Sequence, residues 1–183
     1  MDAFEQVVSE ILWREGFWVR TSVKVELTPE DKKAIDRPSS PRWELDIVAY
    51  RPSDNSLRVV ECKSYLDNPG VGAKWFDGVN AKAAGRYKLF SEPKLREVVL
   101  NRLSAQFSKD GLCRPDPKIR LCLACGKIRD RARDALAKHF KENGWVLLDE
   151  EWLHDSLKEM AQGGYKNQVS AVVAKLLLRG SLE

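Results

Sequence analysis

Four charged side chains lie within two segments that otherwise have the composition of buried β-strands. The stretch RWELDIVAYRPSDNSLRVVECKSY carries Glu44, Asp46, Glu61 and Lys63 among aliphatic and aromatic residues. Two carboxylates beside a lysine can hold a hard divalent cation and orient a water molecule for phosphodiester hydrolysis. Whether this chemistry is available depends on how the two strands place these side chains.

The stretch has the pattern of a β-hairpin whose turn is Pro52-Ser53-Asp54-Asn55. Symmetric pairing about this turn places Asp46 opposite Glu61 and Glu44 opposite Lys63. Because side chains alternate along a strand, Asp46, Glu61 and Lys63 are predicted to project from one face. The residues expected beside them are Val48, Leu57 and Val59, and those expected on the other face are Leu45, Ile47, Val60 and Cys62.

Both faces of the predicted hairpin are largely apolar, so we expect both to be covered, with the charges gathered at one end of a buried sheet. Two carboxylates directly opposite one another repel by several tenths of a kcal/mol, on the order of 0.5 kcal/mol or more, and a divalent cation between them removes this penalty. For Glu44 we expect a cross-strand ion pair with Lys63 rather than metal ligation.

The spacing of these residues resembles the D…(D/E)xK signature of the PD-(D/E)xK nuclease superfamily. Asp46 follows Leu45 in LDIVAY, the segment Ile47 to Val60 intervenes, and Glu61 and Lys63 stand in ECK. The proline that often precedes the first acid is replaced here by Leu45. The resemblance implies a site in which Asp46, Glu61 and the main-chain carbonyl of Cys62 hold Mg²⁺ or Mn²⁺, and Lys63 positions the attacking water.

The resemblance is nearest to Holliday-junction-resolvase-like, very-short-patch-repair-like and restriction-type members, in which a glutamate of the first helix joins the site. Glu5 and Glu10 are the two candidates in FEQVVSEILWREGFWV. On a helical wheel Glu5 falls at the edge of the apolar stripe and Glu10 lies farther toward solvent. Glu5 is therefore favoured as a helper or outer ligand, and Glu10 remains the alternative for this role.

The order of predicted elements indicates an α/β fold. Strands separated by helices imply a mixed central sheet flanked by helices, and the resemblance implies a restriction-endonuclease-like core of helix, three strands, helix and strand. A single domain is expected over 1–183, with the nuclease-like core at about 1–126 and an α/β extension at about 127–181. The predicted helices are 2–15, 80–107, 129–144, 150–161 and 167–180, and the predicted strands are 17–27, 118–126, 145–149 and the two of the hairpin.

Two segments offer contacts to nucleic acid. The loop after the motif contains glycines with Lys74 and Trp75, which can supply charge and stacking. The polar stretch TPEDKKAIDRPSSPR is predicted to be a mobile loop, and it and its flank carry cations that can neutralise backbone phosphates. Those cations are Lys32, Lys33, Arg37 and Arg42.

The remaining features restrict the class of protein. The formal charge of +4 and the pI near 8.9 permit a polyanionic partner without requiring one. No signal peptide or membrane-spanning run is seen, which indicates a soluble, cytoplasmic protein without a membrane partner. Cys122 and Cys125 are expected to be buried strand residues rather than zinc ligands, and His139 and His154 are expected at the surface or as helix caps.

The sequence thus predicts a Mg²⁺-dependent nuclease that hydrolyses phosphodiester bonds in DNA, with duplex or branched DNA favoured. The alternative is a nuclease-fold module that has lost turnover and binds nucleic acid or a protein partner. A more distant reading is an α/β interaction protein that forms a homodimer through the apolar segment VSAVVAKLLL. A homodimer is also compatible with the nuclease, because two active sites suit double-strand cleavage.

Overall fold

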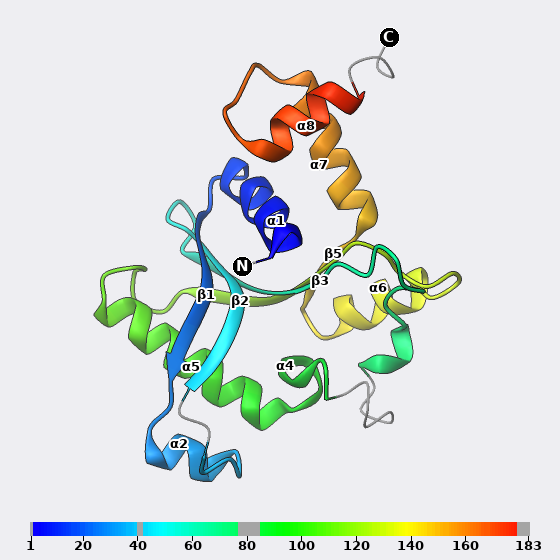
Figure 1. Ribbon diagram of the computed structural model, residues 1–183. Coiled ribbons are helices and arrows are strands. Elements are labelled where there is room, and N and C mark those ends of the chain that lie inside the picture. The colour runs from blue at the N-terminus through cyan, green and yellow to red at the C-terminus, as the bar shows by residue number, and fades with distance from the viewer. Residues whose placement is uncertain (1, 40–41, 77–84, 179–183) are drawn as a thin grey trace.

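A mixed β-sheet forms the centre of the molecule in the computed structural model, which describes residues 2–39, 42–76 and 85–178 (Figure 1). Within these ranges the sheet has five strands in the order β1-β2-β3-β4-β5. The first three pair antiparallel, and β3, β4 and β5 pair parallel. The strands are β1 Trp18–Glu26, β2 Arg42–Arg51, β3 Ser56–Lys63, β4 Lys118–Cys125 and β5 Val146–Leu148.

Helices cover both faces of this sheet (Figure 1). One face carries α4 (Lys88–Ser91), α5 (Pro93–Lys109) and α6 (Arg133–Glu142). The other face carries α1 (Ala3–Arg14), α7 (Glu150–Gln162) and α8 (Val169–Leu178). The predicted α/β class with a mixed sheet flanked by helices is therefore confirmed.

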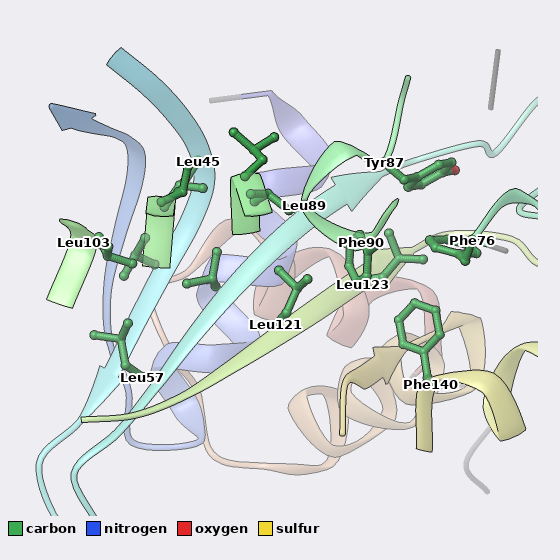
Figure 2. Packing of buried hydrophobic residues seen from close by; sticks show 14 of the residues in the cluster. Leu45, Leu57, Phe76, Tyr87, Leu89, Phe90, Leu103, Leu121, Leu123 and Phe140 are labelled. Carbon is green, nitrogen blue, oxygen red and sulfur yellow. The ribbon is translucent and has the colours of Figure 1, made fainter. Parts of the chain in front are cut away.

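Two hydrophobic clusters, one on each face of the sheet, make up the core. The first lies under α5 and α6, and Figure 2 shows Leu123 of the sheet near Phe90 and Phe140 of the helices, with Leu57 and Leu103 toward the other end of the cluster. The second joins the sheet to α1, α7 and α8, so the C-terminal extension supplies much of its wall. The expectation that both faces are covered is correct.

The hairpin register predicted from the sequence is confirmed near the turn. Ile47 pairs with Val60, Val48 with Val59, and the ladder continues to the last pair at the turn. Strand β2 ends at Arg51 and β3 begins at Ser56, so the predicted turn is also correct.

The predicted face of Leu45 is wrong. Leu45 and Val48 both belong to the first cluster, although they are three positions apart, while Ile47 belongs to the second. A regularly alternating strand cannot place residues three apart on one face. The reversal occurs at Asp46, opposite Ser22 of β1, whose φ of 50° lies in the left-handed region. The β1–β2 ribbon thus turns over where Asp46 stands.

The polar stretch after β1, predicted to be a mobile loop, contains a short helix. Helix α2 spans Pro29–Ala34, and Thr28 caps it by accepting a hydrogen bond from the Asp31 N–H while the Asp31 carboxylate accepts one from the Thr28 N–H. This capping box, followed by proline at the first helical position, explains why the segment orders. The capping residues can be read from the sequence, but the high charge of the stretch favoured the prediction of a loop.

The helical region predicted over 80–107 is two helices, α4 and α5, separated at Glu92 and Pro93. Proline at the start of α5 accounts for the break, because its ring excludes the preceding residue from the helical conformation. The part of the prediction at 80–84 lies outside the described residues. Among the described helices, none has both the length and the apolar character required to cross a membrane.

Gly126, at the end of β4, allows the ends of β3 and β4 to approach closely. Its N–H donates to the Lys63 carbonyl, and a Cβ at this position would lie 2.2 Å from the Ser64 carbonyl oxygen. We predict that Gly126→Ala lowers the free energy of unfolding by about 1–3 kcal/mol, since main chain has to shift. Urea unfolding followed by circular dichroism measures this change.

Gly164→Ala is the matched control, because no atom lies within 4 Å of a Cβ built there. We expect its free energy of unfolding to stay within about 0.5 kcal/mol of the wild type. Equal stability of the two variants would contradict the close approach at Gly126.

Candidate active site

The two central strands separate at the residues that the sequence singled out. The β2–β3 ladder ends at the pair Ile47 and Val60, although β3 continues to pair with β4 as far as Lys63. Beyond the last pair, the Cys62 N–H donates to Asp46 Oδ2 at 2.8 Å. A carboxylate thus replaces a main-chain carbonyl as the acceptor, which satisfies the N–H and fixes Asp46 beside the end of β3.

Lys63 closes the site from the end of β3. Its Nζ lies 2.5 Å from Glu61 Oε1 and 3.1 Å from the Cys62 carbonyl oxygen. Both side chains of this ion pair are about three-quarters buried, with exposed fractions of 24% for Lys63 and 23% for Glu61. The ammonium group therefore contacts two of the oxygens that the sequence analysis assigned to a metal ion.

The ionisation of Glu61 reflects a crowded, partly buried group of charges. Burial raises the pKa of Glu61, the Lys63 charge lowers it, and the charges of Asp46 and Glu5 raise it, with a net shift upward. For Lys63, burial lowers the pKa, but the charge and hydrogen bond of Glu61 and the charge of Asp46 outweigh it, so the pKa is raised. Lys63 is thus cationic at neutral pH, and Glu61 holds its proton more tightly than an exposed glutamate.

Glu5 lies near these carboxylates. Its charge raises the pKa of both Glu61 and the Cys62 thiol. Glu5 also accepts the Asp2 N–H at 3.1 Å while the Asp2 carboxylate accepts the Glu5 N–H at 2.8 Å, which forms the capping box of α1. One side chain therefore both starts the helix and adds negative charge to the site.

Glu10 has a different role from Glu5. Its Oε2 accepts hydrogen bonds from the Ser170 N–H at 3.0 Å and from the Ser170 hydroxyl. Ser170 lies in the first turn of α8, where a carboxylate satisfies unpaired N–H groups and favours the helix dipole. Glu10 therefore joins α1 to α8.

The predicted ion pair between Glu44 and Lys63 is wrong. Glu44 is exposed and lies opposite Lys24 of β1, whereas the lysine pairs with Glu61. The cause is the separation of β2 from β3 before Glu44 is reached, so that symmetric extension of the hairpin fails there.

Aromatic side chains form a wall beside Lys63. The Nζ atom lies 6.0 Å from the ring centroid of Tyr87, whose hydroxyl donates to the Tyr65 hydroxyl at 3.3 Å. Trp75 stacks on Tyr87 with centroids 6.0 Å apart, and the Arg129 guanidinium lies 4.7 Å above the Trp75 ring. This wall brings loop, helix and strand segments together at one end of the site.

Sequence reasoning identified Trp75 in this wall but not Tyr65, Tyr87 or Arg129. Tyr65 follows Lys63 by two residues and could have been noticed from that spacing. Tyr87 and Arg129 have no local signal, because only the folded chain brings them to Trp75.

The cations predicted to contact nucleic acid fall into two groups. Lys74 is exposed in the 3₁₀-helix η1 (Ala73–Trp75), next to the aromatic wall. The others surround α2 at the far end of the β1–β2 ribbon (Figure 1), where Arg42 is four residues from Asp46, roughly 13 Å along the strand. Those others are Lys32, Lys33, Arg37 and Arg42.

Arg37 differs from its neighbours because it is already paired. Its Nη2 lies 2.8 and 2.7 Å from the two carboxylate oxygens of Glu92, and its guanidinium lies 5.3 Å from the Trp43 ring centroid. Lys32 and Lys33 border a hollow at α2 together with Pro29, Asp36 and Pro38. Arg37 therefore fastens α2 to the segment before α5 and is less available to a phosphate.

Neither the two cysteines of β4 nor the two histidines belong to the predicted site. Cys122 and Cys125 are buried in opposite clusters as predicted, and burial raises the pKa of each thiol to about 12. His154 is exposed as expected, and His139, in the last turn of α6, is half-buried against Trp145 with ring centroids 5.6 Å apart.

The ligand set suggested for a metal consists of two carboxylates and a main-chain carbonyl. Among the described residues, no group of three or more His, Cys, Asp or Glu side chains is arranged to hold a metal ion. The oxygens of Asp46, Glu61 and Cys62 are nevertheless hard donors of the type that Mg²⁺ and Mn²⁺ prefer. Burial raises the pKa of the Cys62 thiol, which disfavours the thiolate form that binds metal ions.

Comparison with known proteins leaves the family open. The chain matches no protein-family model and no curated protein. Among solved structures it is similar to the crystal structure of the protein of unknown function AF1548, with 17% sequence identity and a TM-score of 0.47. The match covers 97% of this chain and 77% of that one.

The raised pKa of Glu61 predicts a pH dependence of stability. Because the folded state binds this proton more tightly, the free energy of unfolding falls as pH rises from the ordinary value of 4.5 toward the raised pKa. We expect Glu61→Gln to lack this fall, so its stability relative to wild type increases through that interval. Urea unfolding in EDTA from about pH 4 to about pH 8 measures the difference.

The control is Glu97→Gln, which changes an exposed glutamate of α5. Its pH dependence should follow that of the wild type. Parallel curves for wild type and Glu61→Gln would show that the charges around Glu61 do not perturb its ionisation.

Proposed function

We propose that the protein is a metal-dependent nuclease that hydrolyses phosphodiester bonds in DNA, acting endonucleolytically. The observation that carries this proposal is the separation of β2 from β3, which places the Asp46 carboxylate on the Cys62 N–H beside Glu61 and Lys63. Two acids and a lysine lie where this ladder ends, and all three are partly exposed, so a phosphodiester can reach them from solvent.

The order of elements supports a restriction-endonuclease-like core. Helix α1 is followed by β1, β2 and β3, then by α5 and β4. This is the order of helix, three strands, helix and strand that the resemblance implies, with α2 inserted between β1 and β2. The parallel pairing of β3 with β4 then holds Glu61 and Lys63 in a central strand rather than at a sheet edge.

In this proposal Asp46, Glu61 and the Cys62 carbonyl would hold Mg²⁺ or Mn²⁺. When bound, such an ion lowers the pKa of water and offsets negative charge on the phosphate. Asp46 is held for this role by the Cys62 N–H, which engages one of its oxygens. Burial, with smaller contributions from the charges of Asp46 and Glu5, raises the pKa of Glu61, and a bound cation would favour its ionised form.

Lys63 has two contacts that bear on mechanism. Its ammonium group contacts Glu61 and the Cys62 carbonyl, so it would release at least one of them when a metal ion takes the same oxygens. The freed ammonium can donate hydrogen bonds to the attacking water or to a phosphoryl oxygen that gains charge. The aromatic wall at Tyr87 limits water access on that side of the lysine.

We predict that Asp46→Ala, Glu61→Ala and Lys63→Ala each reduce cleavage by at least about 100-fold, since each removes charge stabilisation in the transition state. Labelled duplex, single-stranded and four-way-junction DNA and an RNA are incubated with Mg²⁺, Mn²⁺ or EDTA. Cutting is expected on DNA with either metal and not in EDTA.

Two matched variants test the assignment of roles. Glu44→Ala removes an exposed carboxylate of the same strand as Asp46, and Cys62→Ala removes a thiol while keeping the carbonyl. Both are expected to retain cleavage. Loss of activity in Cys62→Ala with an unchanged fold would contradict the main-chain role of this residue.

The alternative function is a nuclease-fold module that binds nucleic acid or a protein without turnover. The contact of Lys63 with Glu61 and the Cys62 carbonyl favours it, because an ion pair with the lysine gives this partly buried acid a structural role. Binding of DNA without cutting under any metal would select this function over the nuclease.

We predict that Lys74→Ala weakens DNA binding in EDTA and lowers the slope of log affinity against log salt by about 1, because one phosphate contact is lost. Arg37→Ala should leave that slope unchanged, since its guanidinium is occupied by Glu92. Fluorescence anisotropy with a labelled duplex at several salt concentrations measures both. Equal slopes for Lys74→Ala and wild type would exclude the loop after the motif as a phosphate contact.

A further inference from the structure

A second group of basic residues lies at the opposite end of β3 from the acids and Lys63. Arg51 of β2, Arg58 of β3, and Lys118 and Arg120 of β4 border a hollow of about 230 Å³. Asp54, Ser56, Leu57 and Val146 complete its lining. We call this site the basic hollow.

Like charges stand directly beside one another in the basic hollow. Arg58 is the register partner of Arg120 in the parallel β3–β4 ladder, and Ser56 is the partner of Lys118. Neighbouring side chains of one charge on adjacent strands destabilise a sheet. The fold therefore tolerates a repulsion at this place, which a bound anion would relieve.

Local acids neutralise only part of this charge. Arg51 pairs with Asp54 at 2.7 Å, and Arg58 pairs with Glu15 at 2.9 Å. Within the part of the chain that the structure describes, the side chains of Lys118 and Arg120 form no ion pair or hydrogen bond. Four cations against two carboxylates leave two positive charges at the hollow.

Two of the guanidinium groups are held in place by a buried ring. Arg51 and Arg58 lie 4.6 and 4.4 Å from the ring centroid of Phe17, which is 1% exposed. Such stacking fixes the planar groups before any ligand arrives, so less side-chain entropy is lost on binding. Guanidinium groups match phosphate oxygens in geometry as well as in charge.

The basic hollow is separate from the proposed catalytic groups. Arg58 precedes Glu61 by three residues, roughly 10 Å along the strand, and an odd separation places the two side chains on opposite faces of the sheet. The hollow shares no residue with the acids or with Lys63. It therefore requires an explanation other than catalysis.

We propose that the basic hollow binds consecutive phosphates of a nucleic acid strand. Lys118 and Arg120 are two residues apart in β4, roughly 7 Å, which is about the separation of neighbouring phosphates in a strand. Two cations at this spacing can each contact one of two linked phosphates. Binding at the basic hollow does not depend on the proposed cleavage. Its residues are not those of the proposed catalytic group, and the binding test contains no metal ion.

The test is the salt dependence of binding to labelled single-stranded and duplex DNA in EDTA, followed by fluorescence anisotropy. The Lys118→Gln/Arg120→Gln variant is expected to lower the slope of log affinity against log salt by about 2, since two phosphate contacts are lost. The loss of affinity between about 50 and 200 mM salt then becomes about tenfold smaller than for wild type. Arg120→Lys, which keeps the charge, should retain most of the wild-type slope.

The control is Lys109→Gln/Lys166→Gln, which removes two exposed cations elsewhere on the surface. Its slope should equal that of the wild type, and circular dichroism establishes that each variant is folded. Equal slopes for the two double variants would overturn the proposal. Inorganic phosphate is tested in parallel, and Arg120-dependent phosphate binding without Arg120-dependent DNA binding would also overturn the nucleic acid assignment.

The outcomes separate this inference from the proposed function. If the double variant lowers the slope and the wild type never cuts DNA, the results support the basic hollow and contradict the nuclease. Cutting by the wild type with equal slopes for the two double variants does the reverse.

Discussion

The hydrogen bond from the Cys62 N–H to the Asp46 carboxylate is the interaction on which the site depends. A central strand pair normally continues its ladder, because an unpaired buried N–H is costly. Here the ladder stops at Ile47 and Val60, and a side chain supplies the missing acceptor. The sheet can therefore open between β2 and β3 without leaving this main-chain donor unsatisfied, and the opening exposes polar groups in an otherwise apolar layer.

Two other features make this opening compatible with a stable sheet. The β1–β2 ribbon turns over at Ser22 and Asp46. As a result, Leu45 packs in the first hydrophobic cluster and does not pair with β3. On the other side of β3, pairing with β4 continues to the last residue, and Gly126 permits the close approach of the following chain. One edge of β3 is thus released while the other remains fixed.

The charges around the opening are balanced at the site itself. Lys63 offsets Glu61, while burial and, to a smaller extent, the charges of Asp46 and Glu5 raise the pKa of Glu61. Partly buried charges of this kind cost desolvation energy, and clusters with perturbed ionisation are concentrated at functional sites. The basic hollow lies at the other end of the same strand, so β3 carries an acidic group at one end and excess positive charge at the other.

The sequence by itself determined the hairpin, its register near the turn, the α/β class and the grouping of Asp46, Glu61 and Lys63 at one end of the hairpin. These features follow from local rules: strand alternation, turn chemistry, helix caps and the spacing of Asp46, Glu61 and Lys63. Tertiary structure alone decided which residue pairs with Lys63 and which face of the sheet Leu45 occupies. It also decided that Tyr87 and Arg129 pack against Trp75. Those outcomes depend on where a ladder stops and on contacts between distant segments, and periodicity within a single strand or helix contains no information about either.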